Sequence, residues 1–143
     1  MELKLRFNNS SNKYGIKEEL LGLAKYQAAI NTLKDYAKEQ SLEIKHTDNN
    51  IFEQKCRRQI GNFSYGTDNV FEIPEKIRLT AIVERYTSEN TSIAINMSGE
   101  ETLINRIKTA YENAQPLKKD EAYKLIKEFL KDKLECYGHC KRD

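Results

Sequence analysis

The sequence has few of the features that mark secreted or membrane-spanning proteins. It contains three cysteines, an odd number that fits reduced thiols better than a disulfide framework. Its longest uninterrupted apolar runs are only a few residues long, far below the ~20 residues that a membrane-spanning helix needs. No N-terminal stretch pairs positive charge with an apolar run, as a secretion signal would. We therefore expect a cytoplasmic protein without membrane association.

The familiar catalytic motifs are missing as well. The sequence has no glycine-rich phosphate loop ending in Gly-Lys-Ser/Thr, no Gly-x-Gly-x-x-Gly, no Gly-x-Ser-x-Gly and no His-Glu-x-x-His. With only two histidines, the commonest general base is scarce. No set of residues combines a nucleophile, a base and an orienting group. The sequence therefore favours a non-enzymatic protein, while a carboxylate or lysine mechanism stays open.

The composition indicates one folded domain over residues 1–143. Hydrophobic residues make up 38% of the chain and charged residues 32%, with only two prolines and six glycines. A chain of this length and composition can bury a core without metal or disulfide help. Its 24 basic and 22 acidic residues are spread evenly, which weakens the case for broad nucleic-acid or membrane binding because such binding needs concentrated positive charge.

The N-terminal half contains a strand pattern followed by a long helix pattern. Residues 1–7 alternate apolar and charged side chains, which predicts a half-buried strand. Residues 16–40 keep their apolar positions on one side of a helix. A short strand is expected at 42–45, before a polar turn at 46–50. Residues 61–69 are dense in turn formers and are expected to form a loop or a broad hairpin.

The C-terminal half predicts a hairpin followed by two helices. Residues 77–83 and 93–97 alternate on either side of a polar turn, which is the clearest hairpin pattern in the chain. Ser98 and Glu101 have the spacing of a capping box, so a helix should begin there. A final helix is expected over residues 118–136, after a short link that favours an antiparallel helix pair.

These elements together predict an α+β fold. We expect an antiparallel or mixed sheet of about four to five strands, with a long N-terminal helix and a C-terminal antiparallel helix pair. Residues 137–143 are expected to form a frayed tail.

Basic and aromatic residues in the middle of the chain form a candidate binding patch for nucleic acid or another partner. Cationic groups neutralise phosphates, and aromatic rings stack on bases. Acids at Glu53, Asp68 and Glu72 dilute the positive charge, so the alternative is a solvated basic turn. The candidate residues are Lys55, Arg57, Arg58, Phe63 and Tyr65, with Arg78 and Arg85 as extensions.

One group of residues has the side chains of a metal site. Cys136, His139 and Cys140 cluster near the C-terminus, and Cys56 would complete a tetrahedral set of ligands for a structural zinc. The spacing lacks the usual Cys-x-x-Cys knuckle, so the favoured alternative is a plain tail and no cofactor.

Two pairs of acidic residues and one histidine are explained by their structural positions rather than by catalysis. The pairs Glu18-Glu19 and Glu100-Glu101 fall in the first turns of predicted helices, where negative charge is favoured by the exposed N–H dipoles. His46 is interpreted as a surface residue of the polar turn rather than as a base.

A strip of small residues on the first predicted helix is a candidate interface. Leu21, Ala24 and Ala28 are spaced i, i+3, i+7, with Gly22 beside them. Small side chains let another helix approach closely, which suits self-association or a protein partner. The eight tyrosines add to this expectation because tyrosine is common at interfaces.

Two hypotheses of different classes follow. The first is a small intracellular, non-enzymatic interaction protein that binds a protein partner, with an inhibitor or regulator from a phage or mobile element of a low-GC bacterium as its specific form. That form rests on small size and on the 17 Lys, 12 Asn and 13 Ile residues, which have A/T-rich codons. The alternative is a nucleic-acid-binding accessory factor that uses the patch around residues 55–65. A homo-oligomer is compatible with either.

Overall fold

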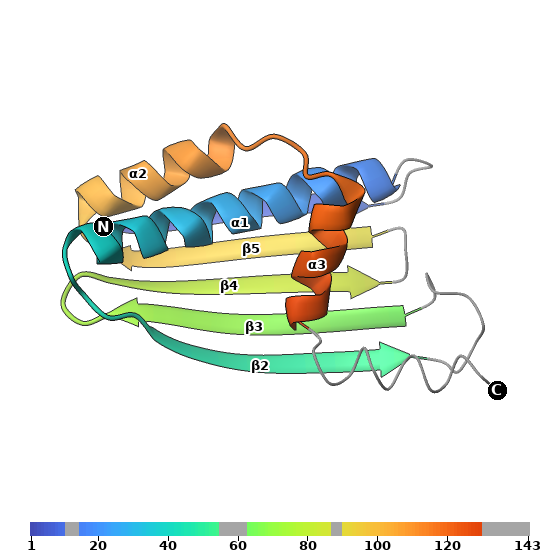
Figure 1. The fold of residues 1–143 in the computed structure, drawn as a ribbon, viewed down its shortest axis with the longest axis horizontal. Coiled ribbons are helices and arrows are strands. Elements are labelled where there is room, and N and C mark those ends of the chain that lie inside the picture. Colours follow the sequence, from blue (N-terminus) through green and yellow to red (C-terminus); the bar gives the residue numbers. More distant parts are fainter. Residues whose placement is uncertain (11–14, 55–62, 87–89, 130–143) are drawn as a thin grey trace.

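In the part of the chain that the structure describes, three helices lie on one side of a five-stranded sheet (Figure 1). A computed structural model describes residues 1–10, 15–54, 63–86 and 90–129. The elements in chain order are β1 (Glu2–Ser10), α1 (Gly15–Glu39), β2 (Lys45–Gln54), β3 (Phe63–Ile73), β4 (Ile77–Tyr86), β5 (Asn90–Gly99), α2 (Glu101–Glu112) and α3 (Lys119–Phe129). None of the described helices is both long and apolar enough to cross a membrane.

The sheet is antiparallel throughout, in the order β1-β5-β4-β3-β2. Its register is uninterrupted, so that Leu79 of β4 lies opposite both Phe71 of β3 and Met97 of β5. Because successive side chains point to opposite faces, this register gathers the buried apolar residues of the three inner strands on one face. These are Phe71, Ile73, Ile77, Leu79, Ala81, Val83, Ile93, Ile95 and Met97.

Helix α1 lies across this apolar face and completes the core. Gly22 allows a close approach, since a Cβ atom placed on it would lie 2.7 Å from the Phe7 ring and 3.1 Å from Ile93 Cδ1. The core residues of α1 recur at helical spacing. They are Leu23, Tyr26, Ala29, Ile30, Leu33 and Ala37.

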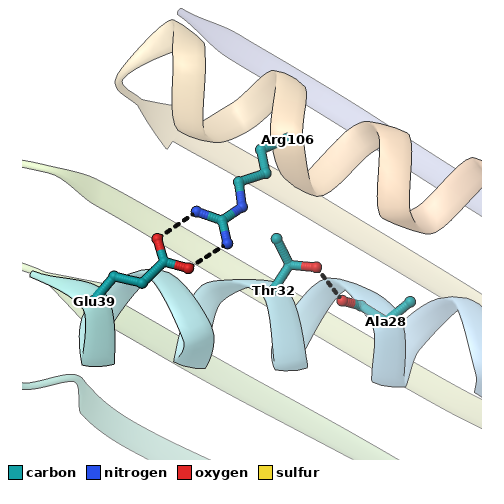
Figure 2. A network of polar contacts seen from close by, with 4 residues as sticks. All are labelled: Ala28, Thr32, Glu39 and Arg106. Atoms are coloured by element: carbon teal, nitrogen blue, oxygen red, sulfur yellow. Dashed lines mark hydrogen bonds and ion pairs between the residues drawn. The ribbon is translucent and has the colours of Figure 1, made fainter.

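Helix α2 runs alongside α1 in the opposite direction, while α3 crosses the sheet (Figure 1). Near the middle of α2, the Arg106 guanidinium donates hydrogen bonds of 2.8 and 2.7 Å to the two carboxylate oxygens of Glu39, the last residue of α1 (Figure 2). These hydrogen bonds lower the pKa of the Glu39 carboxyl below its ordinary value. Near the C-terminal end of α2, Lys25 Nζ donates a 3.1 Å hydrogen bond to the Tyr111 carbonyl oxygen. Polar contacts thus hold the middle and the C-terminal end of α2 to α1.

The predicted α+β fold is confirmed, with an antiparallel sheet of five strands. The long N-terminal helix and the two C-terminal helices follow in the expected order. Among the described residues, however, α2 packs beside α1 rather than beside α3. The antiparallel partner of α2 is therefore α1, and not α3 as expected.

The region after α1 differs from its prediction. Residues 42–44 form no strand, and the polar stretch 46–50 lies within β2 instead of in a turn. Because β2 is an edge strand, its described side chains from Lys45 to Asn49 are exposed and polar residues are tolerated there. The stretch 61–69, expected to be a loop or a broad hairpin, lies from residue 63 onward within the single strand β3, which pairs with β2.

The predicted capping box is wrong, although a helix does begin at Glu101. Ser98 remains in β5, and the N-cap residue is Glu100, which makes no side-chain capping hydrogen bond. The chain turns at Gly99 instead. The Gly99 N–H donates to the Met1 carbonyl oxygen at 3.0 Å, and the Glu100 N–H donates to the Lys76 carbonyl oxygen at 2.9 Å. Backbone hydrogen bonds therefore fix this helix start.

Replacing Gly99 with alanine is expected to lower the free energy of unfolding by about 2–3 kcal/mol. Gly99 has a φ of +153°, and a Cβ atom there would lie 2.2 Å from the Lys76 carbonyl oxygen. Gly66 is the matched control, because a Cβ atom there would meet nothing nearer than 4.0 Å. Gly66→Ala should stay within ~1 kcal/mol of the unmodified protein. Urea denaturation compares the two, and equal losses would contradict the assignment of a special backbone to Gly99.

Candidate functional site

The sheet face away from the helices is a candidate binding surface, here called the open face. Its side chains alternate with the buried ones along each strand, and those described are half-buried or exposed. It includes Lys4 and Arg6 of β1, Ala94 and Asn96 of β5, Thr80 and Ile82 of β4, Asp68 and Val70 of β3, and Thr47 and Asn49 of β2.

Uncharged side chains occupy the middle of the open face. Val70, Thr80, Ile82, Ala94 and Asn96, together called the central patch, are all half-buried. Thr80 lies opposite both Val70 and Asn96, and Ile82 lies opposite Ala94. A centre without charge inside a charged rim is the usual anatomy of a protein–protein interface.

Opposite charges flank the central patch. Arg6, Ala94, Ile82 and Asp68 form one row across four strands, with the two charged residues at its ends. Three strand spacings separate Arg6 from Asp68, roughly 14 Å, so the two cannot pair within one chain. Both are exposed, and neither forms an ion pair with another described side chain. Lys4, beside Arg6 on β1, adds to the positive side.

A polar network lies on the other face of the sheet, where β2 meets β3. The His46 ring stacks on Phe71, with ring centroids 4.3 Å apart and an interplanar angle of 10°. His46 Nε2 lies 2.9 Å from Asn69 Oδ1, an acceptor, so Nε2 carries the proton in this arrangement. Asn69 Nδ2 donates to Thr67 Oγ1 at 3.3 Å. Thr67 and Asn69 are buried, at 1% and 4% exposure.

Tyr26 of α1 faces the same part of the sheet. Burial raises the pKa of its hydroxyl, and the negative charges of Glu128 on α3 and Asp48 on β2 raise it further. The hydroxyl therefore stays protonated at neutral pH. Tyr26 contributes a neutral polar group to the edge of the core.

The network holds the His46 imidazole by a stacked ring and a hydrogen bond. The described part of the chain has no group of three or more His, Cys, Asp or Glu side chains that could hold a metal ion. All three cysteines lie outside it. The network supplies hydrogen-bond partners to buried polar atoms, which would destabilise the fold if they were left unpaired.

The predicted basic and aromatic patch falls partly outside the described residues. Lys55, Arg57 and Arg58 lie outside them, whereas Phe63 and Tyr65 belong to the start of β3. The structure therefore leaves the basic centre of this patch as a prediction.

The two proposed extensions of that patch lie far from each other. Arg85 is opposite Tyr65 in the register of β3 and β4. Arg78 is seven residues away along β4, roughly 23 Å at the rise of a strand, and it lies opposite Glu72. The register thus brings Arg85, and not Arg78, to the aromatic residues.

The predicted zinc ligands Cys56, Cys136, His139 and Cys140 all lie outside the described residues, as does the expected tail at 137–143. These remain predictions.

The small-residue strip on α1 is partly covered within the chain. Ala24 is buried at 4% exposure, while Leu21 and Ala28 are half-buried. Thr32, one turn after Ala28, donates its hydroxyl to the Ala28 carbonyl oxygen at 2.7 Å (Figure 2). Helical spacing places Leu21 and Ala28 on the side of Lys25, which contacts α2. An approaching helix is thus already supplied by the chain itself.

The central patch and the buried amide were not identified from the sequence. The patch has a signal there, since Thr80, Ile82, Ala94 and Asn96 are the uncharged outward positions of the predicted hairpin. Asn69 has no such signal, because it lies in a stretch of turn-forming residues.

Asn69→Ala is expected to lower the free energy of unfolding by about 1–2 kcal/mol. The substitution removes the hydrogen bonds to His46 and Thr67 and leaves the Thr67 hydroxyl buried without this partner. Asn49 on β2 is the matched control, since it is exposed and its replacement by alanine should change stability by less than ~0.5 kcal/mol. Chemical denaturation of both variants measures the difference. A loss at Asn69 no larger than at Asn49 would contradict the network.

Comparison of the chain with known protein families, with curated proteins and with solved structures finds no match to any of the three.

Proposed function

We propose that this chain is a non-enzymatic interaction protein that binds a protein surface on its open face and thereby regulates or inhibits its partner. The observation that carries the proposal is the central patch, an uncharged and half-buried surface with exposed charges on either side. Such a surface loses little hydration when it is covered, and its charged rim orients the partner.

The charges of the open face favour a protein over a nucleic acid. Lys4 and Arg6 are basic, but Asp68 and Glu72 are acidic and belong to the same face. A nucleic acid would be repelled by these carboxylates, because its binding depends on neutralising phosphates. A protein surface can present both signs of charge and so match both sides of the patch.

Site-specific photo-cross-linking tests the proposal. A benzophenone amino acid replaces Thr80 in the central patch or, as the matched control, the exposed Asn105 on α2. After irradiation in a nuclease-treated lysate of the source cells, Thr80 is expected to give protein adducts of defined mass in at least about tenfold excess over Asn105. The thermal melting of both labelled proteins should match that of the unmodified protein.

Equal adduct yields from the two positions would contradict the proposal. Adducts at Thr80 that form only when the nuclease is omitted, and that are lost at moderate salt, would also overturn it, in favour of the nucleic-acid alternative.

A further inference from the structure

We infer that the open face pairs with the open face of a second copy of this chain, so that Arg6 of each copy meets Asp68 of the other. This inference rests on the proposed function, because it names the protein that the open face binds. It is carried by the row Arg6, Ala94, Ile82, Asp68, which has opposite charges at its ends and apolar side chains between them.

The row is complementary to itself under a two-fold rotation. A two-fold axis that runs parallel to the strands, between β5 and β4, places Arg6 of one copy over Asp68 of the other and Ala94 over Ile82. The rotation repeats both contacts, as an isologous interface requires. Facing sheets in proteins cross at about −30°. The row is centred on the two-fold axis, where such a crossing shifts the facing residues least.

Two further observations agree with a second copy as the partner. Arg6 and Asp68 are exposed and have no ion-pair partner among the described residues, so pairing between copies breaks no interaction within the chain. With this axis four strands of about ten residues overlap, over roughly 19 by 30 Å. That is about 570 Å² per copy, or about 1,100 Å² in total, just above the ~1,000 Å² that a specific interface needs.

Charge reversal at the two ends of the row tests the inference. The proteins are the unmodified chain, Arg6→Glu, Asp68→Lys and the double variant, with Lys34→Glu on the exposed surface of α1 as the matched control. Sedimentation equilibrium measures the dimer dissociation constant of each, and thermal melting confirms that each is folded.

We expect the unmodified chain and Lys34→Glu to dimerise with the same constant. Each single reversal places like charges together at two sites of the dimer and should weaken dimerisation by roughly 10- to 100-fold. The double variant should recover most of the affinity. An equimolar mixture of Arg6→Glu and Asp68→Lys should form a heterodimer, since both of its charge contacts are then attractive.

An unmodified chain that stays monomeric up to millimolar concentration would overturn the inference. So would a dimer whose constant is unchanged by Arg6→Glu, or single variants that form no heterodimer when mixed. The proposed function has a separate readout: if the chain is monomeric but Thr80 still cross-links to a different protein, self-pairing fails and the proposed function stands. If Thr80 also gives no preferred adduct, both fail.

Discussion

The alternation of side chains along strands in uninterrupted register is the constraint on which the rest of this structure depends. Each strand points every second side chain to the helices and the others away. Because no residue is inserted in the four strand pairings, the apolar sets of the inner strands coincide on one face. Helices α1, α2 and α3 bury that face, and the stability of the fold is concentrated there.

The same alternation leaves the side chains of the second face outside the core. They are relieved of core packing, so they can combine an uncharged centre with charges of both signs. On the helix-covered face, buried polar side chains must instead form hydrogen bonds. Thr67 and Asn69 occupy such inward positions near the edge of the sheet. There the polar atoms are tolerated because His46 and the two residues themselves form hydrogen bonds.

Sequence periodicity was sufficient to predict the elements that contribute most of the buried apolar side chains. The long helix, the hairpin of β4 and β5, and helix α2 all repeat apolar residues with a clear period, and the structure confirms them. Strand β2 was missed because it is an edge strand. Its described side chains are exposed, so it needs no apolar repeat. The start of α2 was found for the wrong reason, since backbone hydrogen bonds at Gly99 replace the expected side-chain cap.

The candidate site could be predicted only in part, for a different physical reason. The uncharged outward residues of the hairpin are visible in the sequence, but the row that joins them to Arg6 and Asp68 is not. Those two residues are far apart along the chain, and only the pairing of β1 with β5 and of β3 with β4 brings them into line. Long-range strand order is not contained in local periodicity, and electrostatic complementarity across a sheet becomes visible only once that order is known.

The most direct test of this account is the NMR relaxation caused by a soluble paramagnetic agent at increasing protein concentration. At low concentration the agent should relax the methyl groups of Val70, Ile82 and Ala94 on the open face, while Leu79 and Ile95 beneath the helices stay protected. As the concentration rises, the open-face methyl groups should become protected too, because a second copy covers them. Open-face methyl groups that remain equally accessible at every concentration would contradict self-pairing, and protection of these methyl groups in the monomer would contradict an open face.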